Sequence, residues 1–356
     1  MGINGIGPGH LSVGLRMNEV LLGDAQEIAL LTEDQGRKYC LLPIEHTDLW
    51  EYYQEHQNSF WVAREIDLSL DKAELQQRKP DGSYVISEDE RHLLKKILCF
   101  FAAADFIVAD NMTNFMQLVK TPEAIMFYAF QVAMENVHSE TYARLIETFS
   151  VHRAEQIEIT GAVFTDPAVK AKMDWVAQWM DEKIPFVKRL IAFAIVEGVF
   201  FSGSFCAIFW FKSKGKLLNG LCKSNEFIAR DEGLHTRFAT HLYNKHIPES
   251  SKLKEDEIHD MFKEAMEIEQ TFMNKAIQVS LLGMNADSMT QYIQYVTDYW
   301  LKQLNVATIY NVANPFDFME LLSLEGKTNF FEQRVSEYAK ADLQRPTRLD
   351  FGELDF

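Results

Sequence analysis

The chain has 356 residues, of which 47% are hydrophobic and 26 are phenylalanine, and its formal net charge is −17 at pH 7. This length allows one large domain or two ordinary ones, with a sizeable core. The acidic charge argues against nucleic acid and anionic membranes as partners, because both require a basic protein surface. Four scattered cysteines without a C-x-x-C pair fit a reducing compartment, and we predict a cytoplasmic location.

The N-terminal part of the chain predicts little ordered structure before the first helices. Residues 1–16 are rich in glycine and almost uncharged, so we expect them to be disordered or foreign to the native protein. A short helix is expected over residues 17–31 and another around residues 48–58. The run Lys79-Pro80-Asp81-Gly82 then indicates a turn.

Two helix-start signals follow that turn. Ser87 and Glu90 have the spacing of a capping box, which predicts a helix from there to about Val119. The pair Thr121-Pro122 supplies an N-cap and a first-turn proline for the next helix. We expect this second helix to end before Asp166-Pro167, with a charged segment after it.

The most apolar segment covers residues 190–211, where Glu197 is the only charged residue. The segment is long enough to span a bilayer, but a carboxylate near its centre costs ~2.5–3.5 kcal/mol on insertion scales. We therefore expect a helix buried on all sides in the middle of the protein. Further helices are expected over residues 220–246, 255–282 and 286–304.

Two Glu-x-x-His motifs indicate the chemistry of the chain. One is formed by Glu135 and His138, the other by Glu232 and His235. On a helix, residues three apart project from the same face, so the carboxylate and imidazole of each motif can hold one metal ion together. Apolar residues flank both motifs, which predicts that they are buried.

The alternative is that such spacing marks an ordinary solvated helix face. The chain contains two controls of this kind, Asp89-Glu90-Arg91-His92 and Asp256-Glu257-Ile258-His259. Both controls lie in charge-dense segments and are predicted to be exposed. The apolar surroundings therefore favour metal binding only for the first two motifs.

Two isolated carboxylates complete the pattern, namely Asp105 and Glu197, each inside an apolar segment. A buried unpaired carboxylate is costly unless it is neutralised or coordinated. Together with the two motif glutamates they carry four negative charges, which two divalent cations cancel. This is the ligand set of a di-iron or di-manganese carboxylate bundle, with Asp105 at a position where that pattern usually has Glu.

These signals together predict an all-α fold, because strand signals are weak and no repeat is sustained. We expect a ferritin-like helical bundle over residues 17–322 with the di-metal carboxylate site at its centre. A mobile C-terminal tail is expected over residues 323–356.

A tyrosine shares the face of the first motif, because Tyr142 lies four residues after His138 and seven after Glu135. It is either a structural core residue or the site of one-electron oxidation by a metal centre that has activated oxygen. A surviving radical needs a dry, apolar shell. The helical spacing predicts that this shell contains Phe201, Phe205 and Ile228.

Longer runs surround these positions: Phe60-Trp61, Glu65-Ile66-Asp67-Leu68-Ser69, Phe100-Phe101-Ala102-Ala103-Ala104-Asp105, Ala133-Met134-Glu135-Asn136-Val137-His138-Ser139-Glu140, Val196-Glu197-Gly198, Arg230-Asp231-Glu232-Gly233-Leu234-His235, Asn314-Pro315-Phe316-Asp317-Phe318-Met319-Glu320 and Leu324-Glu325-Gly326-Lys327-Thr328-Asn329-Phe330-Phe331. With these runs, the chain from about Pro43 onward resembles the small, radical-generating subunit of class I ribonucleotide reductase, in its eukaryotic form.

The resemblance implies a role for each matching residue. It implies an oxo-bridged pair of iron ions beside a stable tyrosyl radical on Tyr142, with manganese as an alternative metal. Trp61 and Asp231 would connect the metal site to the surface, and Tyr338 would relay the radical outward. The implied ligands are Asp105, Glu135 and His138 for one iron, and Glu197, Glu232 and His235 for the other.

The resemblance also implies an oxidoreductase that works with a partner. The small subunit reacts with O2, forms a homodimer and binds the large catalytic subunit through the acidic tail ending at Phe356. Two other functions are open: a ferritin-like monooxygenase or desaturase with a substrate cavity beside the metals, and a non-catalytic protein that pairs with an active homologue. The ligand types suit iron and manganese equally.

Overall fold

The computed structural model describes residues 28–32, 37, 40–181, 183–277, 281 and 283–319. Within these ranges the chain is helical and forms no strand, apart from two isolated bridges, Arg78–Tyr84 and Leu281–Met284. The all-α prediction is confirmed. The predictions for residues 1–16, for Tyr338 and for the rest of the C-terminal tail lie outside the described residues.

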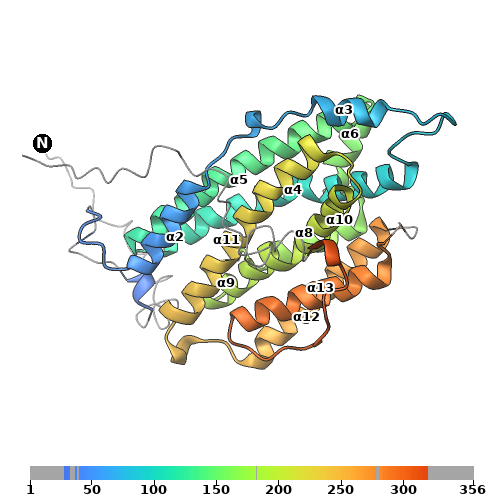
Figure 1. Ribbon diagram of the computed structural model, residues 1–356. Helices are drawn as coiled ribbons and strands as arrows, with labels where there is room; N and C mark the ends of the chain where they lie inside the picture. The colour runs from blue at the N-terminus through green and yellow to red at the C-terminus, as the bar shows by residue number, and fades with distance from the viewer. Residues whose placement is uncertain are drawn as a thin grey trace, which may run out of the picture.

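The long helices lie side by side through the molecule (Figure 1). α2 packs along α5, α5 packs on α4 and α11, and α12 and α13 lie on the opposite side, against the segment that joins α9 to α10. The α-helices are α2 (Thr47–Asn58), α3 (Ser69–Gln76), α4 (Glu88–Leu118), α5 (Pro122–Phe149), α6 (Arg153–Thr160), α7 (Ala162–Thr165), α8 (Pro167–Gln178), α9 (Phe186–Ile195), α10 (Ser202–Ser213), α11 (Lys223–His246), α12 (Glu255–Ala276) and α13 (Ala286–Gln303).

Shorter helical turns connect these elements. Two are π-helical, namely η3 (Val196–Phe200) and η4 (Leu218–Cys222), and they lead into α10 and α11. The 3-10 turns are η1 (Ala29–Leu31), η2 (Ala63–Glu65) and η5 (Glu249–Ser251).

The helix start predicted from the capping box is confirmed. The Ser87 hydroxyl accepts from the Glu90 amide at 3.3 Å, and the Glu90 carboxylate accepts from the Ser87 amide at 2.7 Å. The four cysteines are free, as expected, and the predicted turn before this helix has Gly82 at φ +86°.

Two predicted helix ends are wrong. The helix expected over residues 255–282 ends at Ala276. The helix that begins at Pro122 ends at Phe149 rather than just before Asp166, and α6 and α7 fill the interval. The chain after Asp166 is helical as α8, because the Asp166 carboxylate caps the amides of Ala168 and Val169 at 2.9 and 3.5 Å. Nothing in the residues near Phe149 is a strong helix breaker, so periodicity alone extended that helix too far.

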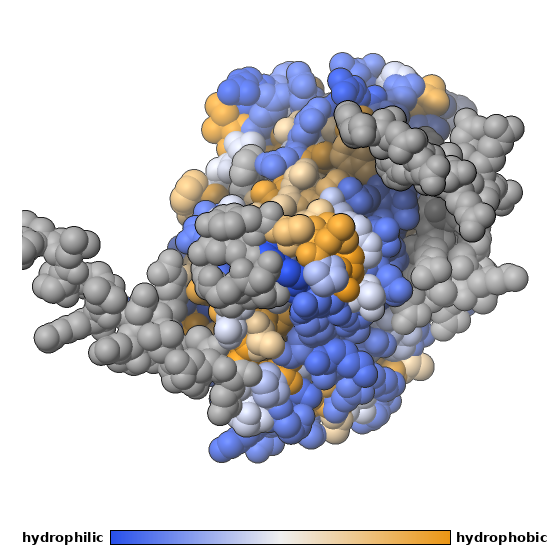
Figure 2. Space-filling view, turned by 90° about the vertical axis from the view of Figure 1, so that its left-hand side faces the viewer, coloured by the Kyte–Doolittle hydropathy of each residue, from blue (hydrophilic) through white to orange (hydrophobic). Residues whose placement is uncertain are grey.

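The apolar segment is a buried helix, as predicted. The continuous helical stretch Phe186–Ser213 has the length and mean hydropathy (2.0) of a membrane span, and its most apolar window lies wholly inside the molecule. Hydrophilic residues cover much of the described surface on the face in Figure 2, between smaller apolar areas. The segment is therefore the central core helix of this bundle.

A buried ion pair joins α8 to α12 beneath that helix. Lys172 and Glu269 are fully buried, with Nζ 2.6 Å from the carboxylate, and the ammonium lies 3.3 Å from the centre of the Phe100 ring. Burial lowers the pKa of Lys172 to about 8, although Glu269 opposes this shift, so the lysine is charged at neutral pH. Removal of either partner leaves the other in the core without a countercharge.

We therefore expect Lys172→Met to lower the free energy of unfolding by ~3–5 kcal/mol, because the Glu269 carboxylate then stays buried and uncompensated. The double variant Lys172→Met/Glu269→Met should recover most of this loss. Urea titration of both variants measures the effect. Lys170→Met on the same helix is the control, since its partner Asp174 is exposed; an equally small loss in Lys172→Met would contradict the buried pair.

Candidate metal centre

The six predicted ligands come from four neighbouring helical segments and are all buried, each with at most 2% of its surface exposed. α4 carries Asp105, and α5 carries Glu135 and His138 one turn apart. The remaining three are Glu197 on η3 and, on α11, Glu232 and His235.

The two motif histidines turn the same ring nitrogen toward the carboxylates. His138 Nδ1 lies 3.3 Å from a Glu135 oxygen and 3.0 Å from a Glu232 oxygen. His235 Nδ1 lies 3.2 Å from the other Glu135 oxygen and 3.1 Å from the other Glu232 oxygen. Each of these glutamates therefore lies between both histidines, so the four side chains would hold metal ions at one common centre.

Atoms from Glu135, Glu197, Glu232 and His235 lie within 4.8 Å of one another. Asp105 lies outside that group, and both of its carboxylate oxygens are buried without a hydrogen bond among the described residues. The charges of His138, Glu135 and Glu232 nevertheless act on the pKa of Asp105, so it belongs to the same cluster. A buried carboxylate whose oxygens have no protein partner is the feature expected of a metal ligand.

The donor set fits two divalent cations. Four carboxylates and two imidazoles are oxygen and nitrogen ligands of the kind that iron and manganese accept, and the structure places them on facing helices around one centre. The two inward Nδ1 atoms are the nitrogens that can coordinate, because the outer Nε2 atoms of both rings face other side chains.

A π-helical turn places Glu197 in this cluster. The turn adds a residue to the helix and frees backbone carbonyls, as π-turns at functional sites do. Side chains satisfy three of these carbonyls: Trp300 Nε1 donates to Gly198 at 3.0 Å, Ser202 Oγ to Val199 at 2.7 Å, and Lys172 Nζ to Phe200 at 2.6 Å. The turn is thus fixed by α8, by α13 and by the first residue of α10, and the direction of the Glu197 side chain is fixed with it.

A buried carboxylate also fixes the start of η4, the turn that leads into α11. Asp71 of α3 accepts hydrogen bonds from the amides of Asn219, Gly220 and Leu221 at 3.2, 3.0 and 2.7 Å. These are amides of the first helical turn, which otherwise have no partner. A side chain at Gly220 would clash with Asp71, so the close approach requires glycine.

Without metal, the cluster holds protons instead. Burial and the neighbouring carboxylates raise the pKa values of Asp105 and Glu197 well above their ordinary values. Burial lowers the pKa of His235, but hydrogen bonds to Glu135 and Glu232 outweigh it and raise the pKa to about 9. The pKa of His138 is raised for a similar reason, with Asp231 the largest opposing effect to burial.

Tyr142 lies beside this cluster, fully buried. Its hydroxyl donates to Asn225 Oδ1 at 2.8 Å, and its ring stacks on Phe101 with centroids 4.1 Å apart. Phe101 in turn contacts Phe201 and Phe205, each at a centroid distance of 5.6 Å. Ile228 is also buried. Burial, followed by the charges of the nearby acids, raises the pKa of Tyr142, so the phenol keeps its proton.

The structure brings Trp61, Asp231 and His138 into one hydrogen-bonded chain. Trp61 Nε1 donates to Asp231 Oδ2 at 2.7 Å, and His138 Nε2 lies 3.2 Å from the same oxygen. Arg230 binds the other oxygen of Asp231 and the carbonyl of Ser59, which lies at the end of α2. The pKa of Asp231 is lowered, since Arg230 and His138 outweigh its burial, so it remains a carboxylate.

Sequence reasoning missed several residues that contact the site. Asn225 precedes Glu232 by seven residues, so it shares a helix face with that ligand, just as Tyr142 shares one with Glu135. The same helical spacing could therefore have indicated Asn225. His56 gave no signal, because its Nε2 meets His235 Nε2 at 3.2 Å only through the packing of α2 on α11. Gln131, whose amide donates to Glu197 at 3.3 Å, precedes Glu135 by one turn.

A helical bundle with buried carboxylates and imidazoles at its centre defines a ferritin-like di-metal carboxylate protein. The family model described as "Ribonucleotide reductase, small chain" matches residues 38–315. The sequence is 46% identical over 327 residues to the ribonucleoside-diphosphate reductase small chain of Trypanosoma brucei brucei, covering 92% of this protein and 93% of that one. It is 44% identical over 325 residues to the ribonucleoside-diphosphate reductase small subunit of Dictyostelium discoideum, covering 91% and 93%.

Among solved structures, the Rnr4 homodimer of Saccharomyces cerevisiae ribonucleotide reductase has a TM-score of 0.73 and 27% identity, covering 88% of this chain and 97% of that one. This chain therefore belongs to the ribonucleotide reductase small-chain family. The resemblance inferred from the sequence is confirmed, and with it an oxidoreductase function as the small subunit rather than as a monooxygenase or desaturase.

Metal binding to this centre should release protons. The pKa values of Asp105, Glu197, His138 and His235 are all raised in the metal-free protein, so metal ions must displace protons from these groups. Metal affinity should therefore rise with pH. Calorimetric titration with ferrous or manganous ion, without oxygen and in two buffers of different ionisation enthalpy, counts the protons.

The same titration at pH 9 should release fewer protons, because the pKa of His235 is about 9 and its ring has then begun to lose its proton. Binding heats that do not depend on the buffer would show that the ligands carry no protons, and would contradict this account.

Proposed function

We propose that this protein holds two iron ions at the Asp105–Glu135–Glu197–Glu232 cluster and forms a radical on Tyr142. The oxidising equivalent passes by way of Trp61 and the tail to a large catalytic subunit that reduces ribonucleotides to deoxyribonucleotides. The observation that carries the proposal is a fully buried phenol beside a four-carboxylate, two-imidazole cluster. Bound iron supplies oxygen activation and one-electron oxidation.

The outer partners of the two histidines prepare them as ligands. Asp231, kept as an anion, accepts from Nε2–H of His138, so the lone pair of this neutral ring lies on Nδ1, toward the cluster. Burial lowers the pKa of His56 well below its ordinary value, so His56 is neutral and its Nε2 can accept from Nε2–H of His235. Both rings then present Nδ1 inward.

The surroundings of Tyr142 protect an oxidised phenol. Its ring is covered on one face by Phe101, and Phe201 and Phe205 contact that ring in turn, so this face of the phenol meets apolar side chains. The amide oxygen of Asn225 holds the hydroxyl in one orientation without being a base. These contacts favour a persistent radical over a phenol that serves only to fill the core.

Trp61 is suited to carry the oxidising equivalent outward. Its indole is hydrogen-bonded to Asp231 and lies 6.0 Å from the His138 ring, at an interplanar angle of 26°. It belongs to the connection after α2, at the edge of the bundle, and is 3% exposed. The route then continues to Tyr338 and the large subunit, which the acidic tail ending at Phe356 binds.

The partner proposals rest on the relatives. Ribonucleoside-diphosphate reductase small chains are named as one chain of a larger enzyme, and the Rnr4 structure is that of a homodimer. We propose the same for this chain: a homodimer that binds a large subunit. A pocket of about 350 Å³ borders Tyr142 and Phe101 but none of the six ligands, so it does not supply the substrate cavity of a monooxygenase.

Replacement of Tyr142 by Phe should abolish the tyrosyl radical and turnover while leaving iron content unchanged, because the phenol is oxidised but does not bind metal. Electron paramagnetic resonance after addition of ferrous iron and oxygen to the metal-free protein measures this. Tyr128→Phe is the matched control: this tyrosine is equally buried on α5, its hydroxyl has no hydrogen bond among the described residues, and its removal should leave the signal intact. A native signal in Tyr142→Phe would refute the assignment.

Two variants of the tail should separate binding of the large subunit from relay of the radical. Deletion of residues 339–356 should abolish co-elution with the large subunit, whereas Tyr338→Phe should keep binding and the Tyr142 radical but lose turnover, because only the electron route is interrupted. Size-exclusion chromatography and an activity assay distinguish the two. Co-elution of the truncated chain would show that docking lies elsewhere.

A further inference from the structure

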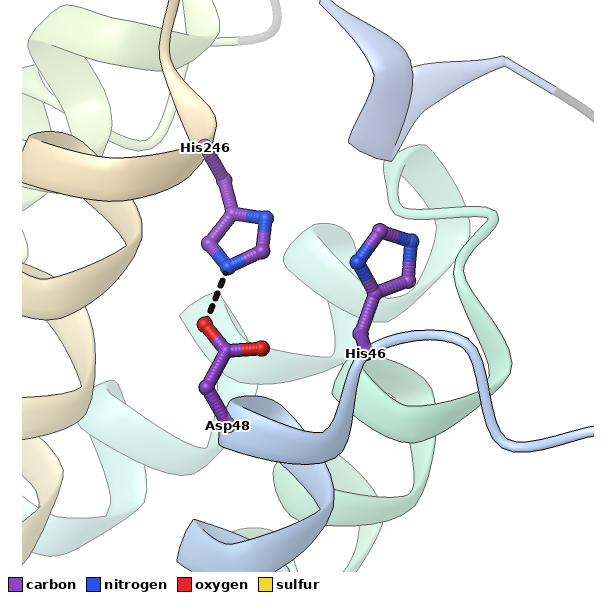
Figure 3. A group of neighbouring side chains, drawn as sticks. All are labelled: His46, Asp48 and His246. Carbon is purple, nitrogen blue, oxygen red and sulfur yellow. Dashed lines mark hydrogen bonds and ion pairs between the residues drawn. The ribbon is translucent and has the colours of Figure 1, made fainter.

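A second cluster of metal-ligand side chains lies where α2 begins and α11 ends (Figure 3). His46 precedes α2, Asp48 is in its first turn, and His246 is the last residue of α11. One ligand atom from each lies within 4.8 Å of the others, and all three side chains are partly buried. None of the three belongs to the di-metal centre.

The carboxylate of this cluster is already oriented. Asp48 Oδ2 lies 2.7 Å from His246 Nε2 and 2.6 Å from His241 Nε2. The rings of His46 and His246 have centroids 5.3 Å apart and an interplanar angle of 70°, and in Figure 3 both rings stand beside the carboxylate. His46 makes no side-chain hydrogen bond that caps α2, so its ring is not required for the helix start.

Two imidazoles and one carboxylate form a ligand set that zinc uses when it keeps one position for water. Bonds of ~2.0–2.2 Å in a tetrahedral site place ligand atoms roughly 3.3–3.6 Å apart. The 2.7 Å between Asp48 Oδ2 and His246 Nε2 must increase to reach this range, and the ligand atom of His46 lies within 4.8 Å of the other two. The His246 side chain is 13% exposed, so water can reach the fourth position.

We propose that His46, Asp48 and His246 bind one zinc ion, with water as the fourth ligand, in a site separate from the di-metal centre. His241 keeps its hydrogen bond to Asp48 and holds the carboxylate toward the ion. The ion ties the start of α2 to the end of α11, two segments that are 198 residues apart in sequence. This site does not depend on the function proposed above.

A purely structural role for the cluster explains less. The two hydrogen bonds from His241 and His246 to Asp48 would be enough to join the helices, and in that explanation His46 contributes only the edge contact of its ring with His246. Metal binding accounts for all four side chains. It also stabilises the folded state, because the ligands converge only when α2 is packed on α11.

The test uses full-length protein whose di-metal centre has first been filled with iron and oxidised in air, so that zinc does not enter there. Equilibrium dialysis against zinc, with metal analysis, should find one additional zinc per chain at unchanged iron content. Zinc-edge X-ray absorption should show imidazole scattering, and the thermal unfolding midpoint should rise with zinc.

His46→Ala is the decisive variant, because it removes a ligand without removing a hydrogen bond that caps α2. It should lose the additional zinc and the rise in unfolding temperature, while its iron content stays native. His246→Ala should lose zinc as well. The matched control is His152→Ala, an exposed histidine before α6, which should bind zinc normally. Absence of additional zinc in the native protein, or undiminished binding in His46→Ala, would overturn the proposal.

Discussion

The burial of four carboxylates at one point is the constraint on which the rest of this structure depends. Asp105, Glu135, Glu197 and Glu232 lie in the core, each at most 2% exposed. Their mutual repulsion and loss of hydration would be prohibitive without countercharge. The cluster therefore requires either protons or cations, and the raised pKa values of Asp105 and Glu197 show how the metal-free chain meets that requirement. Bound cations would take over from those protons as the countercharge of the buried carboxylates.

The surrounding core supports this cluster by restricting its backbone rather than by adding charge close to it. The π-turn that carries Glu197 has three of its carbonyls bound by side chains of Trp300, Ser202 and Lys172. Lys172 is itself paired with Glu269, so this buried ion pair is linked to the ligand turn through one ammonium group. A lysine with a pKa of about 8 donates to both at neutral pH. The position of one ligand thus depends on an ion pair between α8 and α12.

The sequence predicted the parts of this structure that local spacing determines. The Glu-x-x-His motifs, Tyr142 and the capping box at Ser87 each follow from residues three to seven apart on one helix. Isolated acids in apolar segments predicted burial, because few other environments are compatible with them. The end of α5 at Phe149 was not predictable in this way, since apolar spacing continues past it without a strong breaker.

The remaining features depend on contacts between distant segments. The π-turn at Glu197 depends on side chains outside it that donate to its carbonyls, and no residue within Val196–Phe200 predicts it. His56 meets His235 only because α2 lies across α11. In the same way, His46 and His246 become neighbours through packing alone. The spacing of residues along the chain identifies the ligands, but it does not identify the side chains that bind the outer nitrogens of the two histidines.

Through those outer partners, α2 helps to orient the two ligand histidines, although it lies at the edge of the bundle. His56 on α2 faces the outer nitrogen of His235, and Trp61, just after α2, reaches the outer nitrogen of His138 through Asp231. Because the outer hydrogen bond fixes which ring nitrogen faces a metal, the packing of α2 determines how both histidines present themselves. A displacement of α2 would therefore disturb the outer hydrogen bonds of both rings, even if the backbone of the ligand residues stayed in place. The histidine–aspartate contacts at the start of α2 hold this same helix to α11, so the surface cluster and the buried centre depend on one helix–helix contact.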